Sequence, residues 1–347
     1  MLQVNTMSAI REQIIATEPD ERSDRRNQRA KLSVVTPAYN EERNVPVLYA
    51  ALNSILSSLD ADWEWIVVDD HSADKTFEAV TEIALRDPRV RAVRLARNFG
   101  SHTALACGLH QAQGDCAVVL AADLQDPPET VIELLKKWQE GAQVVWAIRG
   151  KRAGERRSRI AFARLYYFLM RRVVGMKGIP STGADFFLLD RIVMDAFRQF
   201  RESNVSILAL ITWMGYRQTA ITYDKQSRLY GQSSWNFEKK LKLAVDSVTS
   251  FSYLPIRLIS CLGFILGLLG FMYAGLVINN ALHGNPVPGW SSLMVVVLLV
   301  GGIQMLMMGV LGEYLWRALD ESRRRPRYLI EASIRLPSVT TDGPVGA

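Results

Sequence analysis

Residues 118–129 read VVLAADLQDPPE, and this stretch decides what kind of domain the chain forms. Its apolar start, with Cys116, is typical of a buried β-strand, and the run ends at Asp123. Gln125 and Asp126 follow, and two prolines then open a segment with helical spacing. Read alone, the stretch predicts a strand, a polar loop and a helix, with Asp126 as the cap of that helix.

The same order of strand, loop and helix repeats along the first half of the chain. Strands are expected at residues 32–36, 65–68, 90–95, 116–120 and 144–148, and helices at residues 42–59, 74–86, 101–113 and 128–139. Such alternation predicts a mostly parallel α/β sheet with helices on both faces. In open sheets of this kind, ligands bind beyond the carboxyl ends of the strands.

Polar clusters stand where ligands are expected. They are PAYNE at residues 37–41, DDHSADKT at 69–76, RNFG at 97–100 and DLQD at 123–126. Because each cluster follows a predicted strand, the four loops are expected on one rim of the sheet, where they form one site. No GxGxxG follows the first strand and no GxxxxGK[ST] occurs, so a Rossmann dinucleotide site and a P-loop are not supported.

Composition narrows the possible partners. The formal net charge is +6, which suits anionic lipid or phosphorylated substrates, and we expect no nucleic-acid partner. The three cysteines, Cys107, Cys116 and Cys261, lack CxxC spacing, which argues against a disulfide framework or a zinc site. Residues 1–31 are polar and have no apolar core of the kind a signal peptide needs, so we predict a flexible tail there.

Two apolar runs near the end, residues 258–278 and 291–312, predict membrane spans within 257–279 and 290–314. Each run is about 30 Å long as a helix, which matches a hydrocarbon core; a pair of buried core helices is the alternative. The connection between them has no Lys or Arg, whereas residues 321–327 carry four arginines. The positive-inside rule therefore predicts a basic cytoplasmic tail at 315–347 and a cytoplasmic N-terminal domain.

Two basic segments are predicted as helices on the membrane surface, at residues 155–177 and 236–256. In the first, Arg157, Arg164 and Arg171 are seven residues apart and share one helical face. The alternative for each segment is a helix whose basic face is simply solvated.

Six motifs together resemble the family-2 glycosyltransferases of GT-A fold. They are TPAYNE (36–41), VVDDHSADKT (67–76), LARNFG (95–100), ADLQDPPE (122–129), GADFFLLDR (183–191) and RLYGQSSW (228–235). The match is closest to the polyprenyl-phosphate glycosyltransferases, the group that resembles dolichol-phosphate mannose synthase and bacterial polyprenyl-phosphate glucosyltransferases. Paired spans after the catalytic domain are also typical of its bacterial members.

The resemblance implies a GT-A (Rossmann-like) α/β domain at residues 32–235 and an enzyme of the bacterial inner membrane. Such an enzyme transfers a hexose from a nucleotide-sugar, with UDP-glucose as the default, to undecaprenyl or another polyprenyl phosphate at the cytoplasmic face. The lipid-linked sugar then serves cell-envelope glycans such as lipopolysaccharide. The family also implies a Mg²⁺ or Mn²⁺ ion and a homotetramer.

The resemblance also implies roles for single residues. The nucleotide-sugar would be bound by Pro37, Tyr39, Glu41, Asp70, Asn98, Gly100, Asp123 and Gln125, of which Asp123 and Gln125 would hold the metal. The acceptor phosphate would be held by Arg228, Ser233, Ser234, Arg157 and Arg164, and the catalytic set would be Asp123, Arg228 and Asp185. Several alternatives stay open: Asp69 could take the place of Asp70, Gly100 could be only a turn residue, and Asp185 could be structural.

The chemistry constrains these roles. The acceptor is a phosphate monoester that is already anionic at pH 7, so the reaction needs cations to hold it and no strong general base. In-line displacement would invert the anomeric configuration. Because one Asp and one Gln leave most metal positions open, we expect the metal and the nucleotide-sugar to bind together, with weak metal affinity in the free protein.

Two departures from the family pattern stand out. Ala121 replaces an acid that many relatives have, and Phe187 replaces an arginine. Two other functions stay under consideration: a processive polysaccharide synthase, which shares the GT-A domain, and a non-catalytic membrane scaffold with a degenerate transferase domain, which the missing acid at Ala121 motivates. The first normally uses a QxxRW helix, which this sequence lacks.

Overall fold

The computed structural model describes residues 30–59, 61–150, 186–200, 206–226, 254–283, 289–323 and 325–335. The predicted strands form as β1 (Lys31–Ala38), β2 (Asp62–Asp69), β3 (Val90–Leu95), β4 (Cys116–Val119) and β5 (Val144–Arg149). The helices between them are α3 (Asn44–Leu56), α4 (Thr76–Arg86), α5 (Ser101–Gln111) and α6 (Thr130–Gln139). Each predicted element is therefore confirmed, with ends shifted by a few residues.

The sheet is mixed, with the strand order β7-β5-β6-β4-β1-β2-β3-β8. Strands β1, β2, β3 and β4 are parallel neighbours, as predicted. Strand β6 (Phe186–Asp190) instead lies antiparallel between β4 and β5, and β7 (Gln218–Tyr223) pairs with β5 in parallel. The prediction of a mostly parallel sheet therefore holds for its first half and is corrected by the antiparallel β6.

The last strand, β8 (Ile330–Ile334), comes from the segment predicted as a basic tail. It pairs antiparallel with β3 at the sheet edge, and the backbone amide of Ala96 donates to the carbonyl of Leu329 at 2.9 Å. The chain thus returns from the long C-terminal helices to the edge of the sheet, which no local sequence pattern indicated.

Two apolar layers cover the two faces of the sheet. Val34 and Trp65 belong to the layer beneath α3, α4 and α6, whereas their neighbours Val35 and Ile66 belong to the layer with α5, α8 (Arg191–Gln199) and α9 (Ile207–Trp213). This division follows from the alternation of side chains along a strand. Because both faces are buried, β4 is apolar throughout, and β5 and β6 are apolar up to their last residues, Arg149 and Asp190.

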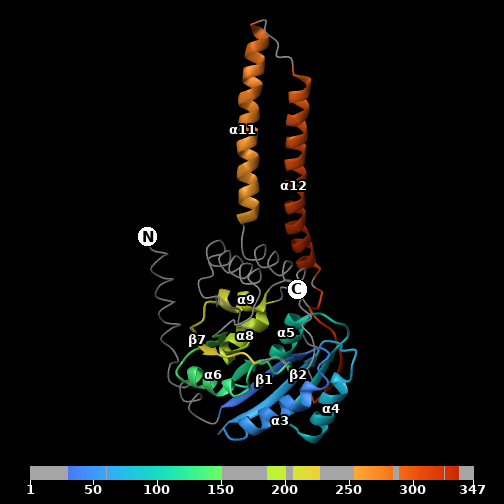
Figure 1. The fold of residues 1–347 in the computed structure, drawn as a ribbon, viewed down its shortest axis with the longest axis vertical. Coiled ribbons are helices and arrows are strands. Elements are labelled where there is room, and N and C mark those ends of the chain that lie inside the picture. The colour runs from blue at the N-terminus through green and yellow to red at the C-terminus, as the bar shows by residue number, and fades with distance from the viewer. Residues whose placement is uncertain are drawn as a thin grey trace, which may run out of the picture.

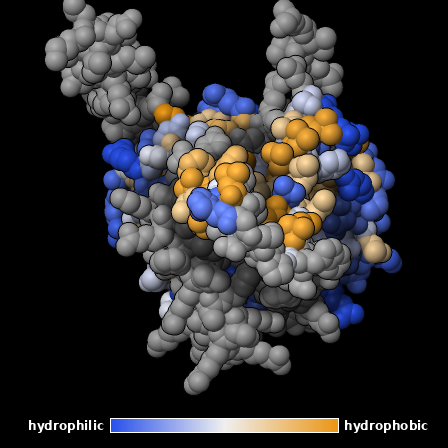
Figure 2. Space-filling model, turned by 90° about the horizontal axis from the view of Figure 1, so that it is seen from above, coloured by the Kyte–Doolittle hydropathy of each residue, from blue (hydrophilic) through white to orange (hydrophobic). Residues whose placement is uncertain are grey.

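Helices α11 (Leu254–Leu282) and α12 (Trp290–Ser322) project side by side from one end of the domain (Figure 1). Among the described residues, one stretch of 22, Leu299–Asp320, is long and apolar enough to cross a membrane, and the apolar stretch Ile259–Tyr273 in α11 is shorter. The two helices approach closely at Gly263, where a Cβ would lie 3.0 Å from Met307 Cε. Figure 2, seen from the end where they project, shows apolar residues gathered centrally and hydrophilic residues around them.

Three predicted segments lie outside the described residues. They are the N-terminal tail up to residue 29, the basic segment 155–177 and most of the basic segment 236–256.

Candidate active site

Four loops meet at the carboxyl edge of the parallel strands. Ala38 at the end of β1 is the register partner of Asp69 at the end of β2, and Val35 pairs with Val119 of β4 in the same direction. The loops after β1, β2, β3 and β4 therefore leave the sheet on one side, as the sequence predicted.

The first two loops are locked to each other by reciprocal hydrogen bonds. The Asn40 amide donates to Ser72 Oγ at 2.9 Å, and Asn40 Oδ1 accepts from the Ala73 amide at 2.9 Å. The Glu41 amide donates to Thr76 Oγ1 at 2.8 Å. Asn40 adopts a left-handed conformation with φ 57°, which a short polar side chain tolerates better than most. The loop carrying Glu41 is thus held in one position before any ligand binds.

Asp70 joins the second loop to the third. Its carboxylate is buried, with Oδ1 accepting from the Phe99 amide at 2.7 Å and Oδ2 from the Gly100 amide at 2.8 Å. Burial raises the pKa of Asp70 above its usual range, and the two amides oppose that rise by favouring the charged form. Gly100 has φ 93°, a conformation that favours glycine, which supports its reading as a turn residue.

Asp69 has a structural role in the same loop. Its Oδ1 accepts from the Ser72 amide at 3.1 Å and from the Ser72 hydroxyl, and its Oδ2 lies 3.2 Å from Arg94 Nη1. Burial raises the pKa of Asp69, while Ser72 and Arg94 favour its charged form. The Asp69 and Asp70 carboxylates are therefore both held by protein groups, and the choice between them as a ligand-binding residue stays a prediction.

The fourth loop carries the candidate metal ligands. Asp123 is only 8% exposed, and its Oδ1 accepts from the Gln125 amide at 3.2 Å. Leu124 between them has φ 56°, an unfavourable conformation for a bulky residue. Backbone strain of this kind clusters at functional sites, because only a well-packed surrounding structure maintains it.

The side-chain oxygens of Asp123 and Gln125 suit a hard divalent ion, but they are too few to complete its coordination. Within the described residues, no three His, Cys, Asp or Glu side chains form a metal-binding group. Carboxylate and amide oxygens are suitable ligands for Mg²⁺ or Mn²⁺, and such an ion keeps several waters or takes substrate phosphate oxygens. Asp123 and Gln125 therefore fit a metal that a bound diphosphate completes.

Asp126 is not the helix cap that the sequence predicted. Helix α6 begins at Thr130 with Glu129 at its N-cap position and no side-chain cap. Asp126 is instead buried beside the end of β7, where it accepts from the Tyr223 hydroxyl and lies 3.9 Å from Lys225 Nζ. Burial raises the pKa of Asp126, and the nearby Lys225 lowers it.

The segment after β7 also contacts the loop of residues 123–126, which we call the metal loop after its candidate ligands. The Gln226 amide donates to the Gln125 carbonyl at 2.9 Å. Tyr223 and Lys225 were missing from the predicted site. They follow Asp126 by about a hundred residues, and no motif of the sequence joins the two segments. The contact depends on β7 pairing with β5, which only the assembled sheet provides.

The remaining predicted residues divide into two sets. Pro37 is half-buried, whereas Tyr39 and Asn98 are exposed on the loops after β1 and β3. Phe187 is fully buried in β6, with its ring centroid 5.3 Å from that of Trp146, so it is part of the core. Apart from Asp123, the residues predicted to hold the acceptor or to act in catalysis all lie outside the described residues. They are Asp185, Arg228, Ser233, Ser234, Arg157 and Arg164.

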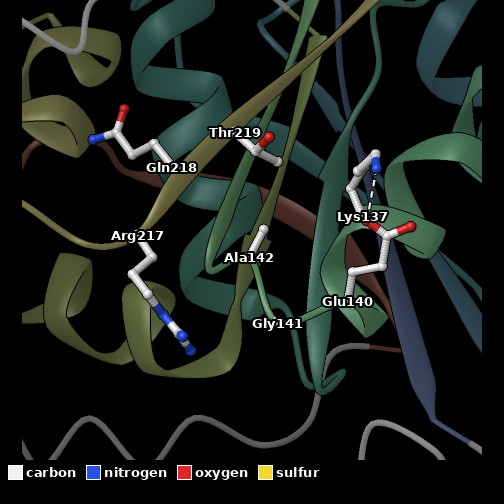
Figure 3. Close-up of a pocket in the computed structure, with 7 residues that line it drawn as sticks. All are labelled: Lys137, Glu140, Gly141, Ala142, Arg217, Gln218 and Thr219. Carbon is white, nitrogen blue, oxygen red and sulfur yellow. Dashed lines mark hydrogen bonds and ion pairs between the residues drawn. The ribbon is translucent and has the colours of Figure 1, made fainter.

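A pocket elsewhere on the domain is unrelated to this site. It lies near the starts of β5 and β7, at the opposite ends of these strands (Figure 3). Its lining is Lys137, Glu140, Gly141, Ala142, Arg217, Gln218 and Thr219. Lys137 Nζ and Glu140 Oε2 form an exposed ion pair at 2.6 Å, and no predicted site residue lines the pocket.

Sequence comparison shows that this α/β domain is a glycosyltransferase. Residues 33–197 match glycosyl transferase family 2, and the chain belongs to that family.

Among individual proteins, an uncharacterized glycosyltransferase of Synechocystis is 41% identical over 301 residues, covering 86% of this chain and 94% of that protein. The bactoprenol glucosyl transferase of Shigella phage SfV is 35% identical over 302 residues, covering 87% of this chain and 98% of that protein.

A solved structure, glucosyl-3-phosphoglycerate synthase from Mycobacterium tuberculosis with Mn²⁺, UDP and phosphoglyceric acid, is similar at 19% identity and a TM-score of 0.47. It covers 66% of this chain and 79% of that chain, a likeness too distant to transfer any ligand or residue role.

Proposed function

We propose that this glycosyltransferase transfers glucose from a nucleotide-sugar to bactoprenol phosphate, a polyprenyl phosphate lipid. The observation that carries the proposal is the 35% identity to the phage SfV bactoprenol glucosyl transferase over 98% of its length. The family match ends at residue 197, whereas this similarity spans 302 residues. It therefore extends well beyond the nucleotide-sugar domain, into the part of the chain that a lipid acceptor would need.

The donor would lie across the carboxyl edge of the sheet. In the proposed arrangement, the base and ribose are bordered by Pro37, Tyr39, Glu41 and Asp70. The Asp70 carboxylate also holds the loop of Gly100. The two loops that carry these residues are already joined by the Asn40 and Ser72 contacts. A preorganised pocket lowers the entropy cost of binding the nucleotide.

The leaving group would depart beside Asp123. A divalent ion bound by Asp123, Gln125 and the donor diphosphate would stabilise the charge that develops on the leaving phosphate. Asp126 and Tyr223 fix the loop that carries these ligands, and Lys225 adds a positive charge next to it. Stabilising the leaving group in this way is the main electrostatic task of the site.

The acceptor needs little activation. Its phosphate is anionic at pH 7, so its oxygen can attack the anomeric carbon directly and a strong general base is not required. Cationic and hydroxyl groups must instead hold it, and we assign this task to Arg228, Ser233, Ser234, Arg157 and Arg164. Attack opposite to the leaving group would invert the anomeric configuration.

The membrane placement is part of the proposal. We infer that α11 and α12 form two spans with the catalytic domain on the cytoplasmic side, because four arginines lie in residues 321–327 and no Lys or Arg lies between the helices. The apolar stretch of α12 supports one span, and the uncharged run of residues 258–278, long enough to cross a hydrocarbon core, supports the other. A homotetramer remains a prediction from the family resemblance.

A donor panel tests the proposal. Purified full-length protein is mixed with Mn²⁺, undecaprenyl phosphate and radiolabelled UDP-glucose, UDP-galactose or GDP-mannose, and the lipid product is extracted. We expect label in the lipid with UDP-glucose, and none with Asp123→Ala. Absence of a lipid product with every donor, despite nucleotide binding, would favour the non-catalytic scaffold instead.

A further inference from the structure

Strand β8 connects the end of the membrane helix to the edge of the sheet beside the candidate site. Helix α12 ends at Ser322, and the chain then passes Tyr328, whose hydroxyl lies 3.0 Å from His110 Nδ1 of α5. The backbone pairing of Ile330–Ile334 with β3 follows directly. The segment is thus fixed both by a side chain at its start and by a ladder along its length.

One side chain of β8 reaches toward the site. Glu331 Oε2 lies 3.1 Å from Arg94 Nε of β3 and 3.2 Å from His71 Nδ1 in the loop after β2. His71 has φ 59°, and its Nδ1 also lies 3.0 Å from the Leu95 carbonyl, so the ring occupies a defined position beside the strand end. The C-terminal strand therefore contacts the loop that carries Asp70.

Arg94 also contacts two residues of the loop region after β2, Asp69 and Ser72. Its Nη1 lies 3.2 Å from the buried Asp69 Oδ2, and its Nη2 donates to the Ser72 carbonyl at 3.2 Å. Ser72 in turn accepts from the Asn40 amide of the first loop at 2.9 Å. A guanidinium presents its donors in a fixed planar fork, so the group that binds Nε also sets the direction of the other two nitrogens.

We propose that Glu331 is a positioning residue of the nucleotide-sugar site, which acts by orienting Arg94 on Asp69 and Ser72. The strand after the membrane helix is then a functional part of the catalytic domain. This inference rests on the proposed function, because it concerns the donor site of that reaction. Glu331 touches neither substrate nor metal in this arrangement; it keeps the loops after β1 and β2 in the geometry that binds the nucleotide.

The expected effect is on donor affinity. Glu331 is about half exposed and Arg94 is mostly buried, so their ion pair is weak by itself. Loss of a partly exposed ion pair of this kind changes an equilibrium constant by about two- to fivefold. Glu331→Gln should therefore raise KM for UDP-glucose and the Kd for UDP with Mn²⁺ by about two- to fivefold, with kcat unchanged.

The matched control is Arg335→Gln. Arg335 follows the same strand and donates to the Leu85 carbonyl at 3.3 Å, at the far end of α4 from the strand-end loops. We expect Arg335→Gln to match the wild type in KM and Kd, the two variants to melt at the same temperature, and Glu331→Asp to recover at least half of the lost affinity.

The experiment uses full-length protein in nanodiscs, with steady-state rates for the lipid product and calorimetry for UDP with Mn²⁺. Equal KM and Kd in Glu331→Gln and Arg335→Gln would overturn the positioning role while leaving the proposed function intact. A fall in kcat together with a lower melting temperature would also overturn it, because that result shows a general structural defect. Failure of the wild type to bind UDP would overturn both the donor site and this inference.

Discussion

The Asp70 carboxylate accepts a hydrogen bond from the Gly100 amide at 2.8 Å and so joins the ends of β2 and β3. Its other oxygen accepts from Phe99 at 2.7 Å, so both oxygens face backbone donors. A single buried carboxylate thereby determines the shape of the loop on which Asn98 stands. Any base or ribose contact made by Asp70 must use its remaining lone pairs.

Asp70→Asn should weaken both the fold and the donor site. The amide has one acceptor oxygen and one donor group, so its NH₂ would face a backbone N–H and leave that donor unsatisfied. Such a buried mismatch costs about 1–3 kcal/mol. We expect a lower melting temperature and weaker UDP binding by calorimetry. Glu82→Gln, at an exposed position of α4, should change neither, and an Asp70→Asn protein as stable as that control would contradict this role.

Metal binding should depend on the nucleotide. In the proposed site, Asp123 and Gln125 would supply few of the ligands that a divalent ion needs, and the donor diphosphate would supply others. We expect Mn²⁺ titrations followed by electron paramagnetic resonance to show weak binding to the free protein and at least tenfold tighter binding with UDP present.

Asp123→Asn is the matching variant for this test. It should abolish the increase in Mn²⁺ affinity that UDP gives, without changing the melting temperature by more than a few degrees. Tight Mn²⁺ binding to the protein without nucleotide would rule out a site completed by the diphosphate.

The contact between Tyr223 and Asp126 should support catalysis from outside the metal site. Tyr223→Phe removes the hydroxyl that donates to the buried Asp126 and leaves the carboxylate less satisfied. We expect a loss of about 1–3 kcal/mol in unfolding free energy and slower glucosyl transfer, because the metal loop is less firmly held.

Thr222→Ala is the control for this contact, since Thr222 is the exposed neighbour on the same strand. If Tyr223→Phe and Thr222→Ala had the same stability and rate, the contact would have no role in holding the loop.

His110 should make stability depend on pH. Burial, helped by the charges of Arg327 and Arg198, lowers the pKa of His110 to about 4, whereas an unfolded histidine has a pKa of about 6.5. Between these values the unfolded state binds more protons, so the unfolding free energy falls as the pH falls from 6.5 toward 4, by up to about 3 kcal/mol. Melting temperatures measured across this window should show the fall.

His110→Gln should remove most of this slope, and His283→Gln, at an exposed position after α11, should keep it. Because His110 contacts Tyr328, the same variant also reports on the docking of the C-terminal segment. An unchanged slope in His110→Gln would assign the pH dependence to other groups.

The sequence by itself determined the elements and the edge of the sheet at which the polar strand-end loops lie. Apolar runs of strand length, helical spacing and polar strand ends are local patterns, and they correctly placed β1 to β5, the helices between them and the loops of Asp70 and Asp123. The parallel order then required these loops to share one edge, since the carboxyl ends of parallel strands lie together.

Only the tertiary structure decided how those loops are held. The antiparallel insertion of β6, the return of β8 to β3, and the contacts of Asp126 with Tyr223 and of Glu331 with Arg94 join residues far apart in the chain. Asp126 illustrates the limit: its sequence neighbours suggested a helix cap, but β7 placed a hydroxyl beside it. Such pairings depend on strand register and packing between distant segments, for which a local pattern contains no information.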